Sequence, residues 1–191
     1  MRLGLFRDFV FHDPAWDFRS FDWDRDVDYV EAQVPYLSAV ALDYRAFSAR
    51  GGKLLMYTGL ADPVTSPLDT FEYYDSVVDQ NGGLKATRRF YRFFPVPGMA
   101  HCSGGAGTST FDALAALEAW VERGIAPNTI PASHSSNGRV DRTRPLCAYP
   151  AIARYKGSGS IDDAANFSCA AGEPREPRPD RPGPPSAPRS R

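Results

Sequence analysis

No stretch of this 191-residue chain approaches the run of about 18 apolar residues that a membrane-spanning helix needs. Neither sign of charge dominates, because 22 basic and 23 acidic residues leave a formal net charge of -1. Residues 1–13 contain no apolar core of the kind found in secretory signal peptides. These absences indicate no membrane span, no visible signal peptide, and no preference for nucleic acid or an acidic membrane surface as a partner.

Cysteine and histidine are both scarce, with Cys 3 and His 3 in the whole chain. An odd number of cysteines allows one pair at most and leaves one thiol without a partner inside the chain. The three are Cys102, Cys147 and Cys169. His12 and His134 have no clustered metal ligands, so surface or turn positions are expected for both. His101 differs from them because it lies directly before Cys102 in a glycine-rich loop.

A regular pattern of elements begins at residue 53. Residues 53–58 form a short apolar run between glycines, which is typical of a buried strand. The sequence Ser-Pro-Leu-Asp at 66–69 predicts the start of a helix, which Asn81 and the two glycines after it end. The apolar face expected for this helix comprises Leu68, Phe71, Tyr74 and Val78.

The order of strand and helix is then repeated. Residues 89–96 are rich in aromatic side chains and predict a second strand. Residues 110–123 predict a second helix. Its apolar side is expected to contain Leu114, Leu117 and Val121, with Trp120 packed in or beside the core. The alternation predicts an α/β fold with parallel strands and right-handed crossovers.

The regions on either side are less regular. Residues 1–23 are expected to form loops and short turns, followed by short helices at 24–33 and 43–49. Regular pattern is lost beyond residue 126, and residues 172–191 contain no bulky apolar side chain that could offset the entropy of ordering. The predicted organisation is an α/β core at 1–126, an irregular extension at 127–171 and a disordered Pro/Arg-rich tail at 172–191.

Two side chains of catalytic type follow the two predicted strands. Asp62 comes after the first strand and His101 after the second, and ligands of open parallel sheets bind at these carboxyl ends. A carboxylate bonded to one imidazole nitrogen fixes the ring's tautomer, which leaves the other nitrogen free to take a proton from a nucleophile. An Asp before Pro is commonly a turn residue, but its place beside His101 favours a catalytic pair.

No nucleophile accompanies this pair. The chain has no G-x-S-x-G sequence and no serine on a strand-to-helix turn ahead of Asp62. Ser103 is too close to His101 in sequence to be activated by it, and Ser48 lies in a predicted helix. The chain therefore carries an acid and a base without the third member of a triad.

Two other groups of charged residues have the chemistry of ligand sites. Alternating acids at Asp22, Asp24, Asp26 and Asp28 resemble a calcium loop, but Val27 and Gln33 stand where that loop needs glycine and glutamate. We expect these acids to be solvated at the start of a helix. Arg142 and Arg144 could bind a carboxylate or phosphate, although salt links that hold the C-terminal segment are the simpler expectation.

Residues from about 43 to 170 resemble the C-terminal part of the tannase and feruloyl esterase family. The matching stretches are RGGKLLMYTGLADPVTSP, FYRFFPVPGMAHCSGG, ALEAWVERGIAP and RTRPLCAYPAIARYKGSGSIDDAANFSC. The resemblance implies the last strand–helix units of an α/β-hydrolase and cleavage of carboxylic esters of aromatic acids, such as galloyl or feruloyl esters. It also implies that Asp62 is the triad acid and that His101 is the triad base.

The resemblance also accounts for the cysteines. It implies a disulfide between Cys102 and a cysteine beside the nucleophilic serine, which lies upstream of the residues present here. It further implies a second disulfide between Cys147 and Cys169, which would staple a segment poor in regular pattern. The family's lid, calcium site and oxyanion-hole segment would also lie upstream, so no cofactor is expected in this chain.

These expectations combine into one main hypothesis and one alternative. The main hypothesis is a C-terminal fragment of a serine-type carboxylic ester hydrolase, inactive by itself because the nucleophile-bearing portion is missing. Disulfides indicate an oxidising compartment, so the full-length relative is expected to be secreted or periplasmic. The alternative is an inactive remnant, or one subunit of a split protein, that acts in binding or assembly.

Overall fold

The computed structural model describes residues 3–35 and 41–172. The chain divides into two compact units, Met1–Ala41 and Leu42–Arg191. The boundaries predicted at residues 126 and 171 both lie within the second unit and stay predictions. Disorder was predicted for residues 172–191, of which all but Gly172 lie outside the described residues.

The first unit is built around aromatic rings and three short helices. These are η1 (Leu5–Val10), η2 (Phe18–Ser20) and α1 (Asp26–Gln33). The rings of Phe6 and Trp16 stack at 5.6 Å, and those of Phe11 and Trp16 at 5.0 Å. The prediction of loops for residues 1–23 was wrong at η1, because stacking between rings supports a helical turn that has no apolar periodicity.

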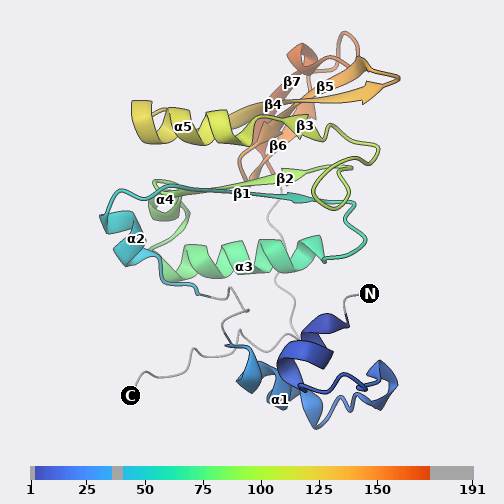
Figure 1. Ribbon diagram of the computed structural model, residues 1–191. Coiled ribbons are helices and arrows are strands. Elements are labelled where there is room, and N and C mark those ends of the chain that lie inside the picture. The colour runs from blue at the N-terminus through green and yellow to red at the C-terminus, as the bar shows by residue number, and fades with distance from the viewer. Residues whose placement is uncertain (1–2, 36–40, 173–191) are drawn as a thin grey trace. The chain divides into compact units, whose positions relative to one another are not determined.

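Two strands of the second unit, β1 (Leu54–Gly59) and β2 (Tyr91–Val96), pair in parallel, from Leu54 with Tyr91 to Gly59 with Val96. The helices around them are α2 (Arg45–Ala49), α3 (Pro67–Gln80), α4 (Leu84–Thr87) and α5 (Ala113–Arg123). The parallel strand–helix–strand–helix order is confirmed, with Pro67 at the start of α3. Figure 1 shows α3 on one side of the two strands and α5 on the other.

Strand β2 is buried on both faces because its side chains alternate between two cores. Tyr91 and Phe93 pack with Tyr74 and Val77 of α3. Phe94 and Val96 pack on the other side, in a cluster that contains Met99, Ile130 and Leu146. The aromatic run that predicted this strand therefore supplies the centre of the unit.

The apolar side predicted for α5 was wrong. Leu114 and Val121 are 65% and 60% exposed, whereas Trp120 is 3% exposed and Ala116 packs against the core. The bulky indole decides which side of the helix turns inward, and Lys53 and Arg92 lie over its ring at 5.6 Å. The expectation that Trp120 is a core residue is confirmed.

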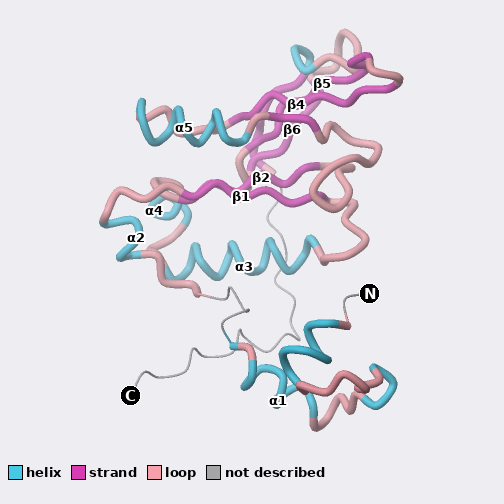
Figure 2. The backbone as a smooth tube through the Cα atoms, viewed as in Figure 1, coloured by secondary structure: helices cyan, strands magenta, loops and turns pink. Residues whose placement is uncertain are grey.

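The region 127–171 is regular, which corrects the prediction of an irregular extension. A three-stranded antiparallel sheet joins β3 (Thr110–Phe111), β4 (Thr129–Ser136) and β5 (Arg139–Cys147), and a second hairpin joins β6 (Ala151–Tyr155) and β7 (Phe167–Ala171). Figure 2 shows these strands in magenta beside α5. Backbone pairing supports these strands although their side chains are mostly polar. Their buried apolar side chains are those of Ile130, Ala132, Leu146 and Cys147.

Candidate functional site

The carboxyl ends of β1 and β2 lie side by side because Gly59 and Val96 are register partners. The backbone N–H of Leu60 donates to the carbonyl of Val96 at 3.0 Å, and that of Ala61 donates to the carbonyl of Met99 at 3.0 Å. The loops that follow both strands leave the sheet at the same end (Figure 2). Backbone hydrogen bonds therefore tie the Asp62 turn to the His101 loop.

The His101 loop folds back on itself through close backbone contacts. Met99 and Gly105 form an isolated antiparallel bridge, and the N–H of Ala100 donates to the carbonyl of Gly104 at 3.1 Å. Gly105 has a φ of 88°, which is unfavourable for residues with a Cβ, and a Cβ there would also collide with the carbonyl oxygen of Gly98. The glycines around His101 are thus needed for a tight turn.

The carboxylate of Asp62 accepts hydrogen bonds at both oxygens. Its Oδ1 accepts from the N–H groups of Val64 at 2.7 Å and Thr65 at 3.1 Å. Its Oδ2 accepts from the Thr65 hydroxyl at 2.5 Å and from His101 Nδ1 at 2.7 Å. The Asp62 side chain is 5% exposed and that of His101 is 50% exposed, so the carboxylate is enclosed and the ring is open.

These hydrogen bonds determine the charge of Asp62 and the tautomer of His101. The Thr65 hydroxyl is the largest cause that holds the pKa of Asp62 far below its usual range, with further contributions from His101 and the two N–H groups. Burial opposes them. Because an ionised carboxylate can only accept, Nδ1 carries the proton of the ring, and Nε2 of neutral His101 can accept one.

An ionised carboxylate bonded to Nδ1 of an exposed imidazole can support proton transfer at Nε2. The structure brings Asp62 and His101 together as the sequence predicted, and the partially exposed ring leaves Nε2 for an incoming hydroxyl. Ser103 donates its backbone N–H to the carbonyl of His101 at 2.9 Å, and within the described segments no serine hydroxyl bonds to the ring. Ser48 lies in α2, as predicted.

The cysteines divide as expected from the resemblance. Cys147 and Cys169 form a disulfide, with 22 residues of sequence separation, that joins β5 to β7. Cys102 is a free, exposed thiol with a φ of 64° in the turn after His101. The predicted disulfide to a cysteine outside these residues stays a prediction.

Among the remaining candidate residues, Arg142, Arg144 and His134 have structural partners. Arg142 pairs with Asp162 at 3.0 Å and donates to the carbonyl of Ala106 at 3.0 Å, which confirms one of the two predicted salt links. The guanidinium of Arg144 instead lies 4.0 Å from the ring centre of Phe167. His134 pairs with Asp141 at 2.6 Å in the β4–β5 hairpin, and His12 has a φ of 51°.

The acids at the start of α1 do not fit a metal site. Asp22 accepts from the N–H groups of Asp24 and Arg25, and Asp26 pairs with Arg25 at 2.6 Å. Across residues 3–35 and 41–172 there is no group of three or more His, Cys, Asp or Glu side chains that could hold a metal ion. No helix in those same ranges is long and apolar enough to cross a membrane.

Sequence reasoning missed two features of the chain. Thr65 holds the Asp62 carboxylate, and its position three residues after an aspartate in a turn was a usable signal. A cluster of Arg88, Arg92 and Asn128 was also missed. Its signal was the density of basic residues in RRFYR, with no acid between them.

Comparison with known proteins gives consistent matches. A family model described as tannase and feruloyl esterase matches residues 4–170, so the likeness includes most of the first unit. The mono(2-hydroxyethyl) terephthalate hydrolase of Piscinibacter sakaiensis is 46% identical over 152 residues, which cover 78% of this chain and 25% of that protein.

Two solved structures are similar in sequence and in fold. An esterase from Aspergillus oryzae is 36% identical with a TM-score of 0.79, over 87% of this chain and 36% of that one. Feruloyl esterase B from Aspergillus oryzae is 34% identical with a TM-score of 0.76, at the same coverage. The chain thus spans about a quarter of the curated hydrolase and about a third of the solved esterases.

Proposed function

We propose that this chain, which belongs to the tannase and feruloyl esterase family, supplies the acid and the base of a serine-type carboxylic ester hydrolase. The observation that carries the proposal is the hydrogen bond of 2.7 Å between His101 Nδ1 and Asp62 Oδ2 at neighbouring strand ends. The parallel strands with helices on both sides are then the last units of an α/β-hydrolase sheet.

The reaction follows from the charges and tautomer of the pair. A serine hydroxyl attacks the ester carbonyl while His101 Nε2 takes its proton, and the ionised Asp62 stabilises the resulting imidazolium. The imidazolium then returns the proton to the alkoxide oxygen of the leaving alcohol, and an acyl-enzyme remains. Water, deprotonated by the same nitrogen, attacks the acyl-enzyme, and the imidazolium returns that proton to the serine oxygen as the acid is released.

The substrate class in the proposal is an ester of an aromatic acid. The names of the relatives support it, since they denote a feruloyl esterase and a hydrolase of a terephthalate monoester. The nucleophile is supplied by a portion of the protein outside residues 1–191, to which Cys102 is tethered by a disulfide. Disulfide bonding at Cys147 and Cys169 suits an oxidising compartment, in keeping with a secreted or periplasmic protein.

A hybrid enzyme tests this proposal. The chain is joined to the nucleophile-bearing portion of the Aspergillus oryzae esterase, and hydrolysis of a hydroxycinnamoyl ester and a terephthalate monoester is measured. We expect activity that His101→Ala abolishes. The matched control is His134→Ala, which removes the other carboxylate-bonded histidine and leaves activity unchanged.

Unchanged hydrolysis in His101→Ala would refute the assignment of the base. A hybrid that folds and hydrolyses neither ester would favour the alternative role in binding or assembly. The reading frame upstream of Met1 separates these cases further, because a continuous frame that encodes a Gly-Cys-Ser elbow supports the hydrolase.

A further inference from the structure

A basic pocket lies at the amino end of β2, opposite the end of the strand that leads to His101. Its volume is about 610 Å³. Its charged and polar lining residues are Lys85, Arg88, Arg89, Arg92 and Asn128. Val96 is four residues beyond Arg92, so the catalytic end of the strand is about 13 Å away at the usual rise of a strand.

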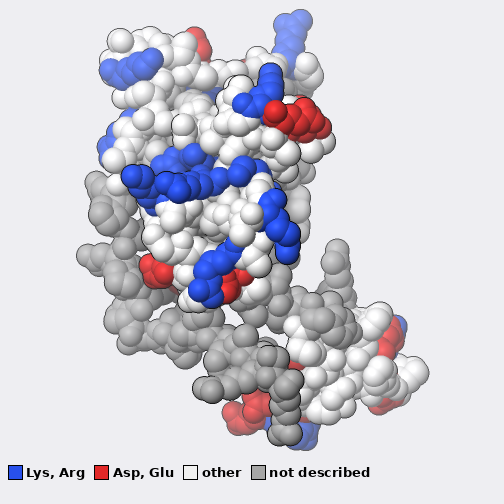
Figure 3. All heavy atoms as spheres, turned by 90° about the vertical axis from the view of Figure 1, so that its left-hand side faces the viewer, with Lys and Arg blue, Asp and Glu red and all other residues white. Residues whose placement is uncertain are grey.

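The pocket contains four cations and no lining acid. None of the four takes part in an ion pair within the described parts of the chain. Figure 3 shows Lys and Arg side chains gathered in a band across the left-hand face of Figure 1, where α4 lies. The positive charge is therefore concentrated and has no counter-charge of its own.

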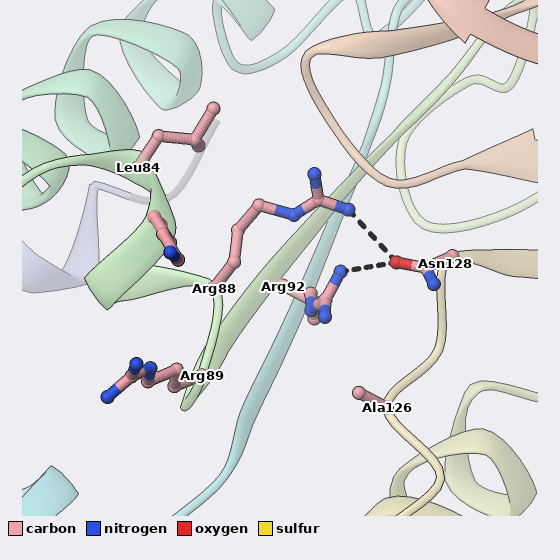
Figure 4. A pocket seen from close by; sticks show the side chains of 7 residues that line it. Leu84, Arg88, Arg89, Arg92, Ala126 and Asn128 are labelled. Carbon is pink, nitrogen blue, oxygen red and sulfur yellow. Dashed lines mark hydrogen bonds between the residues drawn. The ribbon is translucent and has the colours of Figure 1, made fainter.

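Two of the guanidinium groups converge on one neutral oxygen. Arg92 donates to Asn128 Oδ1 at 2.6 Å and Arg88 donates to the same atom at 3.0 Å, as the dashed lines in Figure 4 show. The guanidinium of Arg89 points away from Asn128 in that view. Like charges held close together repel, and a single amide oxygen aligns them without neutralising them.

Arg92 is buried and held in place, as the side chains of ligand-binding sites commonly are. It is 9% exposed, and the Nε atoms of Arg92 and Arg88 are both buried without a hydrogen-bond partner. Trp120 lies against the Arg92 guanidinium and helps to hold it in place. Burial and the nearby charge of Arg88 lower the pKa of Arg92. A bound anion would stabilise the charged form of this guanidinium.

We propose that this pocket binds an oxyanion of the phosphate or sulfate class. A guanidinium offers paired donors in a fixed fork that matches two oxygens of such an anion. A tetrahedral dianion presents oxygens in several directions, which suits cations that come from α4, from the residues after it and from β2. A planar carboxylate would reach fewer of these donors and would compensate less of the charge.

The test is isothermal titration calorimetry of the full chain with inorganic phosphate and with sulfate at constant ionic strength. We expect saturable binding that Arg88→Gln weakens tenfold or more. The matched control is Arg154→Gln, an exposed position in β6 with the same loss of charge, which leaves the affinity unchanged. No saturable binding, or an equal loss in both variants, would overturn the proposal.

Two further measurements guard against misfolding and identify the anion. Arg88→Lys keeps the positive charge and removes the paired donors of the guanidinium, and we expect it to weaken phosphate binding. In NMR spectra of the unmodified chain, we expect the Nε–H signals of Arg88 and Arg92 to shift when phosphate is added. Signals that do not move would refute the site. Tighter binding of glycerol phosphate than of phosphate identifies a phosphate ester as the natural form, whereas acetate binding as tightly as phosphate contradicts the tetrahedral class.

Discussion

The Asp62 carboxylate accepts four hydrogen bonds, of which only one comes from His101. The other three come from Val64 and Thr65 in the same turn. This local support keeps the carboxylate ionised and correctly placed whichever protonation state the ring adopts. Sequence order predicted that Asp62 and His101 would meet, because parallel strand ends share one edge, but it did not reveal which neighbours hold the acid.

Replacing Asp62 with asparagine should lower kcat/KM of the hybrid esterase by about 10⁴-fold, because an amide can bond to the wrong tautomer of the ring. The measurement is steady-state hydrolysis of a hydroxycinnamoyl ester. Asp141→Asn is the matched control, since it alters the carboxylate of the other His–Asp pair. A loss below tenfold in Asp62→Asn would count against its role as the triad acid.

Replacing Thr65 with valine should raise the pKa of Asp62, because the hydroxyl is the largest cause of its lowering. A lowered pKa in the folded state stabilises the fold above the unfolded pKa of about 4, and this stability is lost as the pH falls through the folded value. The free energy of unfolding should therefore fall most near neutral pH in the variant, and little at pH values below the pKa of Asp62 in the folded state.

Carboxyl chemical shifts and urea unfolding across the acid range measure the Thr65→Val effects directly. Thr65→Ser keeps the hydroxyl and serves as the conservative control. An Asp62 titration that is unchanged in Thr65→Val would show that the hydroxyl is not what holds the charge.

At the scale of elements, signals local in sequence predicted α3 and both parallel strands. Pro67 and the glycines after Asn81 define where α3 can begin and end, so tertiary contacts are not needed to place it. The β4–β5 hairpin was missed because its strands are polar. Asn137 and Gly138 at its turn have φ values of 51° and 75°, so this Asn-Gly pair was the usable signal.

The disulfide is predicted to stabilise the strands that carry little apolar surface. Replacing both Cys147 and Cys169 with serine should lower the free energy of unfolding by about 3 kcal/mol, as chain entropy gives for a loop of this length. Denaturant unfolding measures the change. Cys102→Ser, which removes a free thiol, is the control, and equal stability of the paired variant and wild type would contradict the prediction.

Gly59 is the point where β1 approaches the His101 loop. A Cβ at Gly59 would collide with the carbonyl oxygens of Met99 and Ala100, which belong to rigid backbone. Gly59→Ala should therefore displace the loop and lower kcat of the hybrid esterase by tenfold or more. The assay is paired with the His101 ring signals in NMR spectra, and retention of both activity and ring environment would show that the loop can adjust.

At the scale of the whole molecule, sequence reasoning placed the family likeness at residues 43–170, whereas the family model extends it to residues 4–170. The helix predicted at 24–33 corresponds to α1, but η1 was missed because aromatic stacking leaves no helix periodicity to detect. The basic pocket was missed for a related reason. Its residues come from α4, from the residues between α4 and β2, from β2 and from the segment before β4, and only the fold brings Asn128 beside the others.

The chain alone is expected to hydrolyse aromatic-acid esters about 10⁶-fold more slowly than the hybrid, since removal of a triad nucleophile has an effect of this size. Single-turnover assays with a chromogenic ester compare the two proteins at equal concentration. Comparable rates would mean that a nucleophile exists within the 191 residues and that the proposed division of the triad is incorrect.

The contact of Gly59 with the His101 loop has a consequence for assembly. Main-chain atoms of one continuous unit set the spacing of acid and base, and no contribution from a second portion is required to align them. In the proposed enzyme the imidazole would be oriented before the nucleophile-bearing portion docks, and that portion would have the nucleophile and the oxyanion hole left to position. In the proposed enzyme, preorganisation of this kind would let the nucleophile-bearing portion be exchanged between relatives without a change in the geometry of Asp62 and His101.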